Sequence, residues 1–156
     1  MRDTMATSWR RLSDEAPKYT ASRSTRSGQP ALSTAPVRIL IVDDDIKSSD
    51  SLELMLHASG YSETRVAYSG HAALAIAAEF QPAVVLLELN LLDMSGYDVA
   101  RLLRERAQRH ELRLIALTWS REHAGRELAR VAGFERYLLK PVTALDFSGL
   151  FQMEGQ

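Results

Sequence analysis

The residues of this sequence that could do chemistry share one position, because each stands at the end of a short apolar run. They are Asp43, Asp44, Glu88, Thr118 and Lys140. If the runs are parallel strands, their carboxyl ends meet at one edge of a sheet, where ligands bind in open α/β folds. Carboxylates on neighbouring strands about 4.8 Å apart repel each other by roughly 4 kcal/mol at an effective dielectric of about 20. A divalent cation such as Mg²⁺, or the Lys140 ammonium, would relieve that repulsion.

The hydrophobic pattern indicates the elements that would position these residues. Short apolar runs predict strands at 37–42, 64–67, 83–87, 112–117 and 137–139. Segments with helical spacing predict helices from Ser48 or Ser49 to Gly60, at 71–80, from Gly96 onward, at 121–132 behind a Ser120 cap, and at about 143–151. Crossovers of this length require parallel strands and right-handed connections. The predicted fold class is therefore α/β: a (βα)5 doubly wound parallel five-stranded sheet in the order 2-1-3-4-5.

Composition favours one soluble domain behind a tail. The chain has 156 residues, 46% hydrophobic and 25% charged, with no cysteine and a net charge of −1. These values give no reason to expect disulfides, nucleic acid or an anionic membrane as a partner. No apolar run approaches the ~20 residues that span a bilayer, so a cytoplasmic location is expected. Residues 1–36 are rich in Ser, Thr and Arg, and we expect a disordered tail there and a folded domain at 37–156.

Four motifs together resemble those of the receiver domain of two-component response regulators, the CheY-like superfamily. They are ILIVDDD at 39–45, LLELNLLDMSG at 86–96, ALT at 116–118 and YLLKP at 137–141. The resemblance implies a flavodoxin-like fold that accepts a phosphoryl group from a phosphohistidine at the position of Glu88. It implies a Mg²⁺ site formed by Asp43, Asp44, Glu88 and the backbone carbonyl of Asn90. It further implies that Thr118 and Lys140 contact the phosphoryl group, that Tyr137 changes rotamer with it, and that the Lys140–Pro141 bond is cis.

The sequence departs from the family pattern at the acceptor position, where Glu88 stands in place of Asp. Leu92 stands where the family usually has Pro. Trp119 stands where the family usually has a small residue, and its ring could cover the site. The extra methylene moves the carboxylate outward by about 1.5 Å, and misplacement by ~1 Å can cost ~100-fold in rate. Unmodified, Glu88 could instead pair with Lys140 or accept from Thr118 as a partial mimic of a phosphoryl group, which carries more charge and more oxygens. Pairing with Lys140 would leave the site without metal, whereas Glu88 could alternatively join Asp44 on Mg²⁺.

We therefore expect an atypical stand-alone receiver, not an enzyme, which signals by protein–protein contact without ordinary aspartyl phosphorylation. No output domain is expected, because few residues follow Phe151. The expected partners are a sensor histidine kinase, a His phosphotransfer protein or a downstream effector protein. The recognition surface is expected on the fourth helix, fifth strand and fifth helix, and includes Arg121, Arg126, Arg130 and Tyr137.

Two alternatives stay open. The first is a phosphorelay receiver that still accepts a phosphoryl group, through Glu88 or weakly through Asp93. The second, more remote, is a Mg²⁺-dependent phosphohydrolase that uses Asp43 and Asp45 as an Asp-x-Asp pair. Such enzymes typically have Thr or Val where this sequence has Lys47, and they carry a cap domain that is not evident here.

Overall fold

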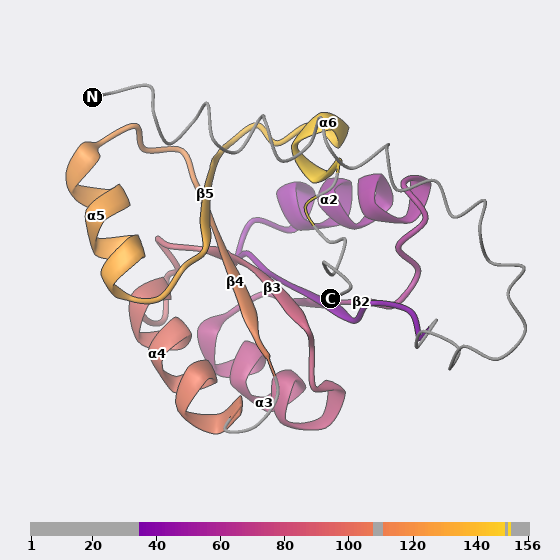
Figure 1. Cartoon of the computed structure of the whole chain (residues 1–156), viewed down its shortest axis with the longest axis horizontal. Coiled ribbons are helices and arrows are strands. Elements are labelled where there is room, and N and C mark those ends of the chain that lie inside the picture. The colour runs from indigo at the N-terminus through magenta and orange to yellow at the C-terminus, as the bar shows by residue number, and fades with distance from the viewer. Residues whose placement is uncertain (1–34, 108–110, 149, 151–156) are drawn as a thin grey trace, which may run out of the picture. The chain divides into compact units, whose positions relative to one another are not determined.

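A parallel sheet of five strands in the order β2-β1-β3-β4-β5 forms the centre of the protein. The computed structural model describes residues 35–107, 111–148 and 150 (Figure 1). The strands are β1 (Ile39–Val42), β2 (Thr64–Ala67), β3 (Val84–Glu88), β4 (Arg113–Thr118) and β5 (Arg136–Leu139). The predicted fold class, strand order and parallel orientation are confirmed.

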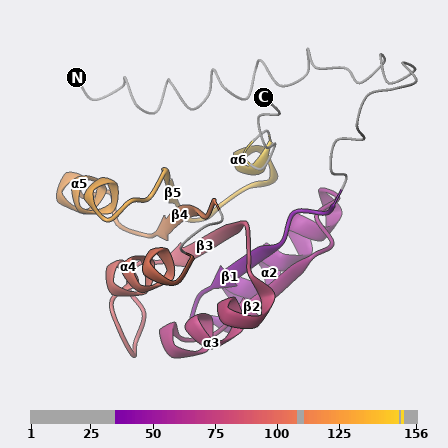
Figure 2. The ribbon, with the colours of Figure 1, turned by 60° about the horizontal axis from the view of Figure 1, so that its bottom comes forward.

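The helices alternate with the strands along the chain. They are α2 (Ile46–Ala58), α3 (Gly70–Phe80), α4 (Gly96–Ala107), α5 (His123–Val131) and α6 (Ala144–Phe147). Figures 1 and 2 show α3 beside α4 on one face of the sheet, with α2 on the opposite face. Strand β1 contacts α2 on one face and α3 on the other, which explains why its sequence is continuously apolar.

Strand β3 is buried at every residue, including Glu88 at its end. The register pairs Val42 of β1 with Leu87 of β3, so Asp43 and Glu88 are the next residues on adjacent strands. Helix α4 begins close to the same point, because a Cβ on Gly96 would lie 2.6 Å from the Glu88 carbonyl oxygen. A side chain at position 96 would therefore push α4 away from the end of β3.

Helix α2 begins earlier than predicted. Asp45, not Ser48 or Ser49, is the N-cap, and its Oδ1 accepts a hydrogen bond from the Ser48 amide at 3.2 Å. Ser49 is fully buried inside the helix, where its hydroxyl donates to the carbonyls of Asp45 and Ile46. The third residue of the acidic run is thus a helix cap, a role that aspartate fills as well as serine.

Helix α5 begins later than predicted, at His123, and Ser120 does not cap it. The Thr118 hydroxyl accepts from the Ser120 amide at 3.1 Å, and the Ser120 hydroxyl accepts from the Glu122 amide at 3.3 Å. These two side-chain turns hold residues 118–122 outside the helix. The N-cap residue Glu122 makes no side-chain capping bond.

The C-terminal helix α6 is shorter than the predicted 143–151, although residues 149 and 151–156 lie outside the described part. Pro36–Ala144 form one compact unit, and the chain from Leu145 onward belongs to another. The expected disordered tail falls mainly on residues 1–34, which lie outside the described residues, so the domain boundaries stay predictions. In the described residues, none of the helices has the length and apolar character needed to cross a bilayer.

Candidate functional site

Lys140 joins the acidic residues of two strands at the carboxyl edge of the sheet. Its Nζ lies 2.5 Å from Asp43 Oδ2 and 2.6 Å from Glu88 Oε2. The three side chains are almost fully buried, with exposed fractions of 4% for Lys140, 1% for Asp43 and 5% for Glu88. Three of the residues singled out from the sequence therefore form one compact charged cluster, referred to below as the Lys140 cluster.

Backbone pairing brings these side chains together. The Lys140 amide donates to the Thr118 carbonyl at 2.7 Å, which continues the β4–β5 pairing by one residue. The peptide bond after Lys140 is cis, as expected for Lys140–Pro141.

The remaining carboxylate oxygens of the cluster are bound by their own loops. Asp43 Oδ1 accepts from the Asp45 amide at 3.0 Å, and Glu88 Oε1 accepts from the Asn90 amide at 3.0 Å. Glu88 Oε2 is buried and accepts no hydrogen bond of regular geometry from the described residues. Its 2.6 Å approach to Lys140 Nζ is therefore an ion pair, and Glu88 depends on Lys140 for its charge compensation.

Lys140 keeps its positive charge in this buried position because of its neighbours. Burial by itself would lower the pKa of Lys140, but the hydrogen bond to Asp43 and the contact with Glu88 outweigh it and raise the pKa above its ordinary value. Lys140 is therefore charged at neutral pH. Trp119 adds a further contact, since its ring centroid lies 5.7 Å from Lys140 Nζ while most of the ring stays exposed. The expectation that Trp119 covers the site agrees with this contact.

Asp44 and Asn90, the other two residues expected to bind metal through a carboxylate and a backbone carbonyl, each take part in a hydrogen bond of the loop after β3. Asp44 Oδ2 accepts from the Leu92 amide at 3.0 Å, and Asn90 donates its amide to Glu88. Within the described residues, no three His, Cys, Asp or Glu side chains are grouped as metal ligands. The oxygen donors are of the type that Mg²⁺ prefers, but two of the carboxylates are already bridged by an ammonium. As placed, the residues do not fit a magnesium centre.

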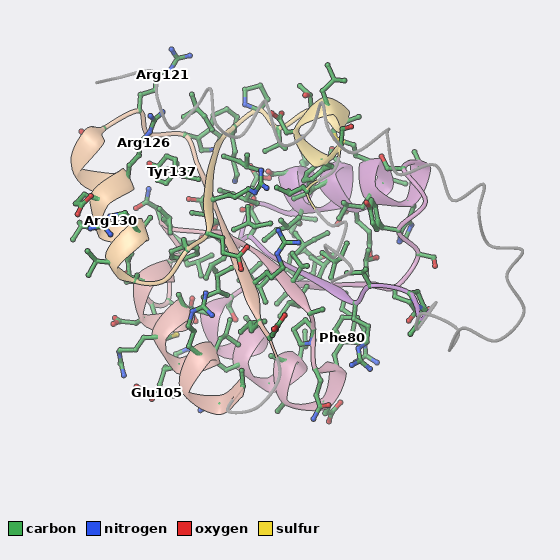
Figure 3. The ribbon with its side chains drawn as sticks, viewed as in Figure 1. Phe80, Glu105, Arg121, Arg126, Arg130 and Tyr137 are labelled. Carbon is green, nitrogen blue, oxygen red and sulfur yellow. The ribbon has the colours of Figure 1, made fainter. Side chains whose placement is uncertain are left out.

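Two further predicted residues lie on the strands β4 and β5. Thr118 is buried, and its hydroxyl accepts from the Ser120 amide. Tyr137 is buried too, and its hydroxyl donates to the Ser120 carbonyl at 3.0 Å. Tyr137 therefore contributes little exposed area to the expected surface, and the Arg126 guanidinium lies over its ring at 5.6 Å (Figure 3).

Asp93, considered above as a second phosphoryl acceptor, is engaged at a different element. Its carboxylate accepts from the Gly70 amide at 2.9 Å and the His71 amide at 3.0 Å, and pairs with His71 Nδ1 at 2.7 Å. These partners all lie in the first turn of α3. The hydrogen bond from Gly70 contributes most to lowering the pKa of Asp93, with further contributions from His71.

Residues that hold α5 were missed in the sequence. The hydroxyl of Tyr97 in α4 donates to the Gly125 carbonyl at 3.2 Å, and the guanidinium of Arg104, also in α4, donates to the Gly133 carbonyl. Their spacing of seven residues places both on one face of the helix, which was the available signal. Nothing in a single sequence shows which carbonyls such side chains reach.

Comparisons with known proteins agree with this architecture. Residues 39–149 match the model of the response regulator receiver domain. The DNA-binding response regulator MtrA of Mycobacterium tuberculosis is 34% identical over 110 residues, which cover 70% of this chain and 46% of MtrA. The chain thus spans about half the length of the MtrA relatives it matches.

Two solved structures extend the similarity to the fold. The chemotaxis protein CheY4 of Vibrio cholerae superposes with a TM-score of 0.68 at 25% identity, covering 72% of this chain and 93% of that one. A response regulator of Burkholderia pseudomallei with a phosphorylated aspartic acid, a calcium ion and citrate gives a TM-score of 0.63 at 25% identity, covering 69% of this chain and 62% of that one.

Proposed function

Because this chain belongs to the response regulator receiver domain family and therefore acts in two-component signalling, we propose that it works without ordinary aspartyl phosphorylation. In this proposal Glu88 keeps the site in one charge state, and the protein signals through contacts made by its surface. The partners would be a sensor histidine kinase, a phosphotransfer protein or a downstream effector protein.

The contact between Glu88 and Lys140 carries the proposal. At 2.6 Å the unmodified glutamate is already paired with the lysine that would otherwise bind an acceptor or its phosphoryl oxygens. The pair is buried, so solvent screens it little, and opening it would leave a charged group unpaired at low dielectric. A phosphoryl group carries about −1.5 to −2 charge and three acceptor oxygens, so the glutamate reproduces only part of its effect.

We also infer that Lys140 takes the place of a divalent cation. A second cation beside the ammonium would meet electrostatic repulsion and would have to displace the Lys140 contact to Asp43 at 2.5 Å. The described geometry supports this inference, because Asp44 is turned to the Leu92 amide. Trp119, which lies over Lys140, would further restrict access from solvent.

The expected docking surface includes α5, the fourth helix along the chain, together with the fifth strand and fifth helix. Arg126 and Arg130 are exposed on α5, as are Leu128 and Val131, and Arg121 is exposed in the loop before it. Figure 3 shows the three arginines along this helix and the preceding loop, with Tyr137 beside them. Arginines interspersed with exposed aliphatic residues suit a partner surface that presents carboxylates around an apolar centre.

Phosphoryl labelling tests the proposal. Wild-type protein, Glu88→Asp and Glu88→Gln are incubated with Mg²⁺ and acetyl phosphate, and intact masses are measured. We expect no labelling of the wild type or of Glu88→Gln. Glu88→Asp should gain one phosphoryl group, because the shorter carboxylate withdraws from Lys140 to the position that the family uses. Stoichiometric labelling of wild-type Glu88 would refute the proposal.

The second candidate is a phosphorelay receiver that still accepts a phosphoryl group on Glu88. It is favoured by the retention of Asp43, Asp44, Thr118 and Lys140, and by the phosphorylated aspartic acid of the Burkholderia pseudomallei relative. Transfer of label from a phosphohistidine donor to wild type but not to Glu88→Gln would support it. Asp93 is a poor acceptor in either case, because both of its oxygens bind the start of α3.

A further inference from the structure

We propose that α4 holds both ends of α5 in position, with Tyr97 and Arg104 as its two positioning residues. This inference rests on the proposed function, since it explains how the docking surface on α5 keeps one position without a phosphoryl switch. Figure 1 shows α5 next to α4, and the two hydrogen bonds from α4 reach the first turn of α5 and the residue Gly133 just beyond its end.

The first contact is at the start of α5. The Tyr97 hydroxyl donates to the Gly125 carbonyl at 3.2 Å, while the Tyr97 ring packs edge-on against Phe134 at 6.3 Å between centroids. The absence of a side chain at Gly125 leaves room for the neighbouring Tyr137 hydroxyl more than for that of Tyr97. A Cβ there would lie 3.2 Å from the Tyr137 hydroxyl and 3.8 Å from that of Tyr97.

The second contact is just beyond the end of α5. Arg104 donates from one nitrogen to the Gly133 carbonyl and from another to the Leu112 carbonyl, the latter at 2.9 Å. Gly133 has a φ of +92°, and a Cβ on it would lie 2.7 Å from Arg104 Nε. The backbone conformation therefore favours glycine at this position, and the Arg104 side chain lies where a Cβ would stand.

Helix α5 needs contacts from other elements because it has few stabilising features of its own. It has nine residues, its N-cap makes no side-chain hydrogen bond, and only Ala129 is buried among its side chains that the structure describes. Isolated helices shorter than about 12–15 residues are marginal in water. The hydrogen bonds from α4 therefore add to the contacts that α5 makes with β5, where Arg126 lies over the Tyr137 ring at 5.6 Å. Neither Tyr97 nor Arg104 has a hydrogen bond to the Lys140 cluster among those described.

Hydrogen–deuterium exchange of the full chain tests directly whether Tyr97 and Arg104 hold α5 in position. We compare peptides that cover residues 125–134 with peptides from β3 in the wild type, Tyr97→Phe and Arg104→Met. Tyr68→Phe and Arg101→Met are the matched controls, because Tyr68 donates to Asp50 and Arg101 donates to Glu105, and neither bond involves α5. Loss of one hydrogen bond worth ~1 kcal/mol corresponds to about fivefold faster local opening.

We expect exchange in 125–134 to rise about fivefold in each α4 variant, with unchanged exchange in β3 and with no change in either control. Arg104→Lys should restore part of the protection. Equal exchange in variants and controls would overturn the proposal, and so would a rise that extends equally to β3, because it would report global destabilisation. Glu88→Gln should leave 125–134 unchanged, and a rise there would show that the site controls α5. Phosphoryl labelling of Glu88 would refute the proposed function without altering these exchange rates.

Discussion

At the scale of single residues, the centre of this protein is a lysine between two carboxylates. Lys140 contacts Asp43 and Glu88 at 2.5 and 2.6 Å in a nearly solvent-free place. Such buried pairs add little net stability when compared with apolar residues, because desolvation opposes the Coulomb attraction. Removing one partner is far more damaging, since it leaves charge buried without compensation. The cluster therefore behaves as a unit.

Replacing Lys140 by methionine tests that interdependence. We expect Lys140→Met to lose about 3–5 kcal/mol in the free energy of unfolding, because both carboxylates lose their counter-charge. The double variant Lys140→Met/Glu88→Leu should recover a substantial part of this loss. Urea unfolding at neutral pH measures both, and the control Lys47→Met, which changes an exposed lysine, should shift stability by less than about 0.5 kcal/mol. A loss below about 1 kcal/mol in Lys140→Met would contradict the buried ion-pair description.

At the scale of elements, the loop after β3 is joined to α3 by Asp93. The carboxylate of Asp93 accepts from the amides of Gly70 and His71, which have no partner inside the helix, so it acts as an additional cap supplied from a distant segment. Met94 packs against Gly70, where a Cβ would lie 2.3 Å from Met94 Cγ. This joint holds the loop that carries Asn90 and Leu92 next to the Lys140 cluster.

Asp93→Asn should weaken this joint in a pH-dependent way. The folded-state pKa of Asp93 lies below its unfolded value of about 3.9, so its stabilisation is complete above that value and is lost as the pH falls through the folded pKa. We expect Asp93→Asn to cost about 1 kcal/mol at pH 6 and clearly less at pH 3. Urea unfolding at both pH values measures this. The exposed control Asp98→Asn should show a smaller loss at pH 6, and an Asp93→Asn loss that is equal at both pH values would contradict the expectation.

At the scale of the whole molecule, the stability of the fold should report whether the site accepts a cation. A ligand that binds only the native state raises Tm by mass action. Because Lys140 already occupies the space between Asp43 and Glu88, we expect Mg²⁺ to add little to the thermal stability of the wild type. The protein should therefore behave as a receiver whose surface is independent of magnesium.

Thermal unfolding in EDTA and in Mg²⁺ measures this change in Tm, with Mg²⁺ at roughly tenfold above the dissociation constant of a functional site. We expect an unchanged Tm for the wild type and a rise of about 3–8 °C for Glu88→Asp, whose shorter side chain releases Lys140. NaCl at matched ionic strength controls for screening. A comparable rise in the wild type would show that Mg²⁺ competes successfully with Lys140.

Much of the architecture could be predicted from the sequence, because the signals are local. Continuous apolar runs at β1, β3 and β4 indicate strands buried on both faces, and the crossover lengths indicate parallel pairing. Helix starts were predicted less well. Asp45 and Ser120 offer similar capping chemistry in sequence, and only their hydrogen-bond partners in the fold show that the first caps a helix while the second forms a turn.

The sequence by itself determined which chemical groups meet at the carboxyl edge of the sheet, because strand order and strand ends follow from hydrophobic periodicity and connection length. The tertiary structure decided how those groups pair. Lys140 bridges Asp43 and Glu88, Asp44 turns to Leu92, and Asp93 caps α3, because each side chain settles on the partners that neighbouring loops bring within a few ångströms. The same holds for α5 and the turn after it, whose carbonyls accept hydrogen bonds from Tyr97 and Arg104 of another helix, partners that no local pattern encodes.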